Sequence, residues 1–139
     1  MNKISLMFTS YTPQTADKAL PKVKRLFENI IMQKNHVVAL QEEIQAIIDS
    51  GSPFEGFVNK KQELNSAVTD LYSAIEQLEA TGVIIKSVDE GLLDFPSRRF
   101  DEEVWLCWKV GEDKIKFWHG KDEGFMGRKP LESTGVIEP

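Results

Sequence analysis

The chain has 139 residues, 41% of them hydrophobic and 28% charged, which is typical of one folded domain and excludes a large multidomain enzyme. Seventeen Lys and Arg against 22 Asp and Glu give a net charge of −5, which disfavours nucleic acid as a general partner. A membrane span is not expected either, because it needs about 20 apolar residues and the longest uninterrupted apolar run is only Val104–Trp108.

The N-terminal residues and the cysteine content of the chain predict a cytoplasmic location. The apolar stretch Ile4–Phe8 is interrupted by Ser5, and no small-residue cleavage site of a signal peptide follows it. Cys107 is the single cysteine, so no internal disulfide can form, which agrees with a reducing compartment.

The first predicted helix begins at Thr12-Pro13, because a capping hydroxyl followed by proline is typical of a helix start. Pro21 lacks an amide hydrogen and disfavours helical geometry at Leu20, so we expect a short first helix and then a bend or restart. The long helix that follows is expected to reach Asp49.

Apolar residues recur at heptad spacing in this long helix and predict a seam like that of a coiled coil. These residues are Val23, Leu26, Ile30, Val37, Leu40, Ile44 and Ile47. Ser50–Pro53 should end the helix, and a short loop through Gly56 should lead into a return helix. The return helix has its own apolar period, at Leu64, Val68, Leu71, Ile75 and Leu78.

Residues 11–82 are therefore expected to form a long antiparallel helical hairpin. Ala67 and Ala74 on the return helix would let the two helices approach closely. Because two helices bury only one stripe each, we expect the hairpin to pack on the C-terminal segment, on a second copy of the chain, or on both.

From Val83 onward, β-branched and aromatic residues alternate with turn residues and predict short strands. Val83–Ile85 and Leu92–Phe95, which stops before Pro96, are expected to pair as a hairpin or to lie as edge strands. A second hairpin is predicted from Val104–Trp108 and Ile115–His119.

The strand at Val104–Trp108 should be central, because its continuous apolar run requires cover on both faces. The predicted fold class is α+β, with a single domain over residues 1–139. Its long antiparallel helical hairpin is followed, at residues 83–139, by a small antiparallel β-sheet with a C-terminal loop.

The length of the connection in the second hairpin decides which side chains share a face. A two-residue turn at Gly111-Glu112, or a four-residue loop from Gly111, puts one group of side chains on the same side. This group is Leu106, Trp108 and Val110 with Ile115, Phe117 and His119, while Trp118 joins Trp105 and Cys107. A three-residue loop would reverse the division for one strand. We predict the first division, with Cys107 and His119 on opposite faces.

The segment Phe117–Leu131 concentrates most of the reactive side-chain types in the chain. It offers an imidazole, carboxylates that can orient or charge it, and a planar cation able to bind a carboxylate or phosphate at two points. These candidates are His119, Asp122, Glu123 and Arg128.

Three functions compete for these residues with a purely structural role. An anionic-ligand pocket using Arg128, His119 and nearby tryptophans is the best of the three. Metal binding by His119 with Asp122, Glu123 or Cys107 is disfavoured, because the chain has two histidines, one cysteine and no HExxH or CxxC motif. Cys107 as a nucleophile with His119 as its base is disfavoured by the expected burial and register. The structural role is favoured over all three, with His119 and Arg128 binding loop carboxylates and carbonyls.

Residues along nearly the whole chain resemble the prokaryotic domain of unknown function family 2203. The matching motifs are Tyr11-Thr12, Ala16, Leu20-Pro21, Gly91–Pro96, Leu106–Lys109, Gly111-Glu112, Trp118-His119, Gly124-Phe125, Gly127-Arg128 and Pro130-Leu131. Members typically carry Phe-Thr in place of Tyr11-Thr12. The resemblance implies no established activity, substrate or cofactor, but it adds Asp94 and Trp108 to the candidate ligand-binding residues.

We expect a small homodimeric binding or interaction module whose hairpins associate, without a metal or other cofactor. The alternative is a small enzyme or anionic-ligand receptor. In that case Arg128 would hold an anionic group, and His119, beside Asp122, would act as acid or base. The residues leave open whether the chain is an enzyme.

Overall fold

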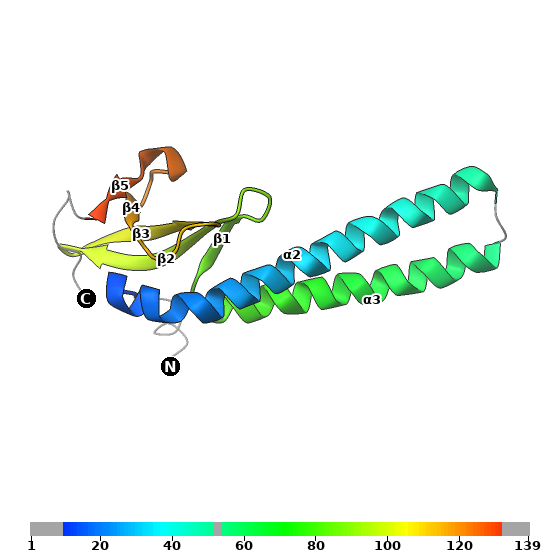
Figure 1. Cartoon of the computed structure of the whole chain (residues 1–139), viewed down its shortest axis with the longest axis horizontal. Coiled ribbons are helices and arrows are strands. Elements are labelled where there is room, and N and C mark those ends of the chain that lie inside the picture. The colour runs from blue at the N-terminus through cyan, green and yellow to red at the C-terminus, as the bar shows by residue number, and fades with distance from the viewer. Residues whose placement is uncertain (1–9, 52–53, 132–139) are drawn as a thin grey trace. The chain divides into compact units, whose positions relative to one another are not determined.

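The computed structural model describes residues 10–51 and 54–131, which form two long helices and a five-stranded antiparallel sheet (Figure 1). This confirms the predicted α+β class, with a helical hairpin followed by the sheet. Contacts divide the chain into two compact units, one of them Arg25–Gln77 and the other the remainder. The stretch Ile4–Phe8 and the residues Ser52 and Pro53 lie outside the described part. In that part, neither helix is long and apolar enough to span a membrane.

Helix α2, Pro13–Ser50, begins as predicted at a threonine cap. The Thr12 hydroxyl accepts a hydrogen bond from the Thr15 amide at 3.0 Å, and Thr15 Oγ1 accepts one from the Thr12 amide at 2.8 Å. The predicted break at Pro21 is wrong, since the helix continues through it. A proline inside a helix costs about 3 kcal/mol. Burial of Leu20 and Val23 on either side offsets this cost.

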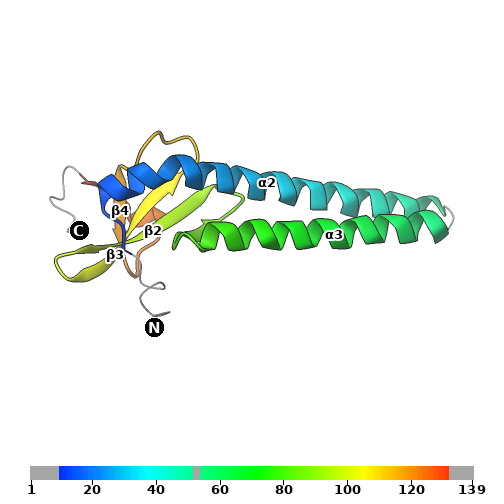
Figure 2. The ribbon, with the colours of Figure 1, turned by 90° about the horizontal axis from the view of Figure 1, so that it is seen from below.

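Helix α3, Phe54–Glu79, runs antiparallel to α2 in both views (Figures 1 and 2). It begins before Gly56, so the predicted loop through that residue is wrong. In the Arg25–Gln77 unit, the predicted seam is where the helices pack. Its core consists of Val37, Leu40 and Ala67, with Leu64, Val68 and Leu71 packed against them.

The sheet belongs to the other unit, and its strand order follows the chain. The strands are β1 (Ile84–Ser87), β2 (Leu92–Arg99), β3 (Glu102–Lys109), β4 (Phe117–Gly120) and β5 (Lys129–Pro130). A short 3₁₀ turn, η1 (Phe125–Gly127), precedes β5. The strand at Val104–Trp108 is central, as predicted, because β3 lies between β2 and β4. The β1–β2 pair is the predicted hairpin.

Strand β2 does not end before Pro96 but continues to Arg99. The carbonyl oxygen of Pro96 accepts a hydrogen bond from the Tyr11 amide at 2.7 Å. Because the nitrogen and carbonyl of a strand residue point to the same side, the missing N–H of Pro96 faces Tyr11 and leaves the pairing with β3 intact. The proline is tolerated there because β1 pairs with β2 only from Leu92 to Asp94.

One face of the sheet lies against the start of α2, the blue end of the helix in Figures 1 and 2. The Tyr11 and Phe95 rings meet edge to face, with centroids 5.2 Å apart. Asp17 Oδ1 accepts a hydrogen bond from the Ile115 amide at 2.7 Å. The buried side chains Leu93, Phe95, Leu106, Trp108 and Trp118 form this face.

The predicted division of faces in the second hairpin is wrong. Cys107 lies opposite Phe117, and Trp105 lies opposite His119. Extended toward the loop, this register places Val110 opposite Lys114. The connection between them then has three residues, and this loop length reverses the predicted division of faces. The side chain of Glu112 helps to hold the loop in this form, because Oε1 accepts a hydrogen bond from the Lys109 amide at 2.9 Å. Cys107 and His119 therefore share a face.

Candidate functional site

Three buried polar residues meet on the sheet face opposite Phe95 and Leu106. Asp94 on β2 lies opposite Cys107 on β3, and His119 enters from β4. Their potential ligand atoms all lie within 4.8 Å of one another. The corrected register brings them together, because alternate residues of neighbouring strands point to one face. We call these three residues the Asp-Cys-His cluster.

The imidazole of His119 makes hydrogen bonds at both of its nitrogens. Nδ1 lies 3.0 Å from the carbonyl oxygen of Gly120, and Nε2 lies 3.1 and 3.0 Å from the two carboxylate oxygens of Asp94. A carbonyl oxygen only accepts, so Nδ1 carries a hydrogen and donates it. A second proton is then shared between Nε2 and Asp94, either as an ion pair or as a neutral hydrogen-bonded pair.

Burial dominates the electrostatics of the cluster. It raises the pKa of Asp94, although the charges of His119 and Lys86 and hydrogen bonds from His119 and Cys107 oppose this rise. Burial, together with the nearby charge of Asp94, raises the pKa of Cys107 to about 11. Without another bound cation the thiol is therefore protonated at neutral pH, and its burial disfavours Cys107 as a nucleophile although His119 lies nearby.

A small cavity of about 120 Å³ opens onto the cluster. Its walls are Lys86, Leu92, Gly124 and Phe125, together with the three cluster residues. Lys86 Nζ lies 3.9 Å from Asp94 Oδ2, and its side chain is about half exposed. The cavity is therefore lined by two apolar side chains and a half-exposed lysine as well as by the cluster itself.

Arg128 is bound by protein groups next to the cluster. Its Nη2 lies 2.9 and 2.8 Å from the two carboxylate oxygens of Glu112 and 3.4 Å from the carbonyl oxygen of Cys107. The guanidinium carbon lies 3.9 Å from the ring centroid of Phe117 and 4.4 Å from that of Phe125. The contacts agree with the structural role predicted for Arg128, in which a loop carboxylate and a carbonyl hold the C-terminal segment on the sheet.

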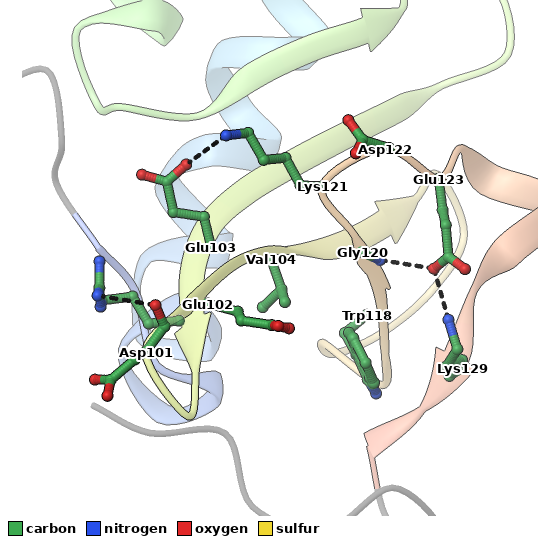
Figure 3. A pocket seen from close by; sticks show the side chains of 11 residues that line it. Asp101, Glu102, Glu103, Val104, Trp118, Gly120, Lys121, Asp122, Glu123 and Lys129 are labelled. Carbon is green, nitrogen blue, oxygen red and sulfur yellow. Dashed lines mark hydrogen bonds and ion pairs between the residues drawn. The ribbon is translucent and has the colours of Figure 1, made fainter.

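Asp122 and Glu123 line a different, wide pocket of about 770 Å³ (Figure 3). Glu123 Oε1 accepts hydrogen bonds from Lys129 Nζ at 2.6 Å and from the Gly120 amide at 2.8 Å. These two bonds lower the pKa of Glu123. The carboxylate that contacts His119 is thus Asp94, and Asp122 and Glu123 face the open pocket with Trp118.

Trp108 lies on the opposite side of the sheet from the cluster, because it neighbours Cys107 along β3. It is buried, and its Nε1 donates a hydrogen bond to the Glu112 carbonyl at 2.9 Å. The structure thus brings together His119 and Asp94, places Arg128 beside them, and separates Trp108, Asp122 and Glu123 from them.

Sequence reasoning gave no role to Lys86, and none to Glu112 as the partner of Arg128. The charge of Asp94 inside the apolar run Leu92–Phe95 was a usable signal, since a carboxylate in a buried strand needs a partner. Nothing local identifies Lys86, which contacts Asp94 only through the pairing of β1 with β2.

The fold and the site define an α+β protein with a helical hairpin, a five-stranded antiparallel sheet and a buried Asp-Cys-His cluster. The chain belongs to the family described as Uncharacterized conserved protein (DUF2203), whose model matches residues 9–131. This confirms the family resemblance seen in the motifs. Comparisons with curated proteins and with solved structures gave no match.

Proposed function

We propose that the chain is an interaction module that forms a homodimer through the helices of the Arg25–Gln77 unit. The observation that carries this proposal is the set of large apolar side chains left exposed on these helices. They are Met32 at 62%, Val38 at 39%, Ile48 at 54%, Phe54 at 76% and Tyr72 at 64%. Covering these side chains with a second protein chain would remove apolar surface from water, which favours association.

The packing inside this unit explains why apolar surface remains. The buried core of the seam includes the small side chain of Ala67, and its larger neighbours Leu64, Val68 and Leu71 are only partly buried. Two helices cover one stripe on each other, and a third layer is needed to cover the flanks. In the described part of this unit, α2 and α3 are the only elements.

A second copy of the chain is the occupant that suits this surface. Helix α3 alone has 26 residues and is about 39 Å long, so two hairpins can align side by side as a four-helix bundle. At the loop end of the hairpin, Ile47, Ile48, Gly51, Phe54 and Phe57 line an apolar cavity of about 390 Å³. A twofold axis would bring the same apolar surface of each copy into contact, and this symmetry limits the assembly to a dimer.

Analytical ultracentrifugation of the full chain at micromolar concentrations tests this proposal. We expect a dimer, and we expect Ile48→Glu and Tyr72→Glu each to weaken it at least tenfold, since burying a charge in the interface costs more than about 1.4 kcal/mol. Asn35→Glu and Asn65→Glu are the matched controls, because they add the same charge at exposed polar positions of the same helices. A wild-type chain that remains monomeric at every concentration would contradict the proposal.

The alternative, an anionic-ligand receptor at His119, Asp122 and Arg128, has less support. His119 binds Asp94, and the charge of Arg128 is paired with Glu112. One observation favours it: in the described part of the chain, Arg128 Nε is buried without a hydrogen-bond partner. A small anion that displaced Glu112 could use this donor, and a thermal-shift screen of carboxylates and phosphates would detect it.

A further inference from the structure

We propose that Asp94, Cys107 and His119 bind a divalent transition-metal ion of the zinc class. The proposal goes beyond self-association, because the cluster lies on the sheet and not on the helices of the Arg25–Gln77 unit. It also departs from the sequence-based expectation of no metal site.

The positions of the ligand atoms suit a tetrahedral ion. Zinc binds sulfur at about 2.3 Å and nitrogen or oxygen at about 2.0–2.2 Å, which separates neighbouring ligand atoms by about 3.3–3.8 Å. In the cluster, Nε2 of His119 lies 3.0 Å from Asp94 Oδ2, and all three ligand atoms lie within 4.8 Å of one another. Small side-chain rotations that move Nε2 and Oδ2 slightly apart, and that bring more distant ligand atoms closer together, would therefore place all three at bonding distance from one ion.

The hydrogen bond at the far side of the imidazole supports metal binding at Nε2. Histidine ligands of metals usually donate the other ring N–H to a carbonyl or carboxylate, which fixes the tautomer and the ring orientation. His119 Nδ1 makes this bond to the carbonyl oxygen of Gly120, the next residue in β4. Nε2 consequently points at Asp94, and a metal ion that displaces the proton shared between them would bind the Nε2 lone pair.

The types of ligand select the class of metal. Thiolate and imidazole ligands prefer zinc and similar ions, whereas magnesium and calcium take sites made of oxygen atoms. One thiolate, one carboxylate and a neutral imidazole together carry two negative charges. A divalent ion makes the buried centre neutral, which avoids the cost of burying net charge.

Three protein ligands leave a fourth position open, as in zinc sites that bind water or substrate. The cavity of about 120 Å³ that borders all three cluster residues has room for such a ligand, because a water molecule occupies about 30 Å³. Leu92 and Phe125 form apolar walls, and the half-exposed Lys86 side chain can move away from Asp94. The open position would therefore accept water or one small oxygen or nitrogen ligand.

The test uses the full chain, without a polyhistidine tag and stripped of metal, titrated with Co²⁺ as a spectroscopic probe. We expect one Co²⁺ per chain, with a thiolate-to-cobalt charge-transfer band and the intense visible bands of four-coordinate cobalt. Added Zn²⁺ should displace the cobalt and remove both signals. Because this experiment uses the wild-type chain, it does not depend on whether any variant folds.

Variants then assign the ligands, with circular dichroism to confirm that each one folds. Cys107→Ser should lose the charge-transfer band, and His119→Gln should weaken Zn²⁺ binding by at least about 100-fold, since even loss of an outer-shell partner costs 10–100-fold. His36→Gln, which changes the other and exposed histidine, should bind as the wild type does. A wild-type spectrum without the thiolate band at saturating Co²⁺ would overturn the proposal. Equal weakening by His36→Gln and His119→Gln would also overturn it.

Discussion

The guanidinium of Arg128 lies between the rings of Phe117 and Phe125 and binds the carboxylate of Glu112. Its side chain is only 14% exposed, so the ion pair is largely shielded from water. Glu112 also accepts a hydrogen bond from the Lys109 amide, so one carboxylate joins the loop after β3 to the C-terminal segment. At this position a residue suited to binding an anion instead connects two parts of the fold.

Replacing Arg128 with Ala should therefore lower the free energy of unfolding. We expect a loss of about 2–3 kcal/mol, because Glu112 would keep a partly buried charge without its partner and two rings would lose a contact. Urea unfolding measures the change. Lys121→Ala is the control: its ion pair with Glu103 is exposed, so the change should stay within about 0.5 kcal/mol. Equal small losses for both variants would contradict the structural role of Arg128.

Tyr11 connects the start of the described chain to two distant segments. Its hydroxyl donates a hydrogen bond to the Thr81 carbonyl, and its main chain binds Pro96 and Ser97. Burial raises the pKa of Tyr11 above its ordinary value of 10.0. The phenol must therefore keep its proton for these contacts to be stabilising.

The stability that Tyr11 provides should consequently be lost at high pH. Above the ordinary pKa the folded chain retains a proton that the unfolded chain has released, so the free energy of unfolding falls as the pH rises through this window. We expect the difference between the wild type and Tyr11→Phe to be constant below about pH 9 and to shrink by about pH 11. Urea unfolding across this range measures it. If the stability difference between the wild type and Tyr11→Phe instead grew with pH, the proposed direction of the pKa shift of Tyr11 would be contradicted.

Among the secondary-structure elements, the turn between β1 and β2 depends on a close approach that only glycine allows. Gly91 has a φ of +70°, and a Cβ at this position would lie 2.5 Å from Val110 Cγ2. The carbonyl oxygen of Gly91 also accepts a hydrogen bond from the Val110 amide at 2.9 Å. Gly56, in contrast, lies in α3 with open space around its missing side chain.

The same substitution at these two glycines should have opposite effects. Gly91→Ala should lower the free energy of unfolding by about 2 kcal/mol or more, because strain and overlap add. Gly56→Ala should raise it by about 0.5–1 kcal/mol, because alanine loses less entropy in a helix. Thermal unfolding of both variants measures the signs. A neutral Gly91→Ala would contradict the close contact with Val110.

Local patterns were enough to predict most elements, but the pairing of the last hairpin needed long-range information. The apolar periods of the two helices, which include Val37 on α2 and Leu71 on α3, identify the packed helices. The apolar run Val104–Trp108 identifies the central strand. The loop length after β3 depends on Glu112, which binds Lys109 nearby and Arg128 far along the chain. Without that contact the sequence does not determine which side chains of the two strands share a face, and its prediction that Cys107 and His119 lie on opposite faces is wrong.

The helix start and Pro21 show the same limit for α2. The Thr12 cap is a local feature, so it could be predicted. The continuation through Pro21 is accompanied by burial of Ala16, Leu20 and Val23, which depends on tertiary packing that the local sequence does not show. For the candidate site, residue types alone identified His119 and the family motif added Asp94, but their contact joins β2 to β4 across β3.

For the whole molecule, a dimer that forms through the helices would couple folding to concentration. The proposed interface buries Ile48 and Tyr72, which are exposed in the single chain. Binding that favours the folded state raises stability by mass action. We therefore expect the melting temperature of the wild type to rise between low and high micromolar concentration, and that of Tyr72→Glu to rise less. Differential scanning calorimetry measures both, and a melting temperature independent of concentration in the wild type would argue against the dimer.

The main-chain contacts of Tyr11 with Pro96 and Ser97 also occupy the side of β2 that extends beyond β1. An uncovered strand edge is a template on which another chain can add a strand and begin to aggregate. The proline and the segment at Tyr11 together remove this template. Truncations or fusions that displace this segment would therefore reduce solubility during expression, even where the remaining sheet still folds.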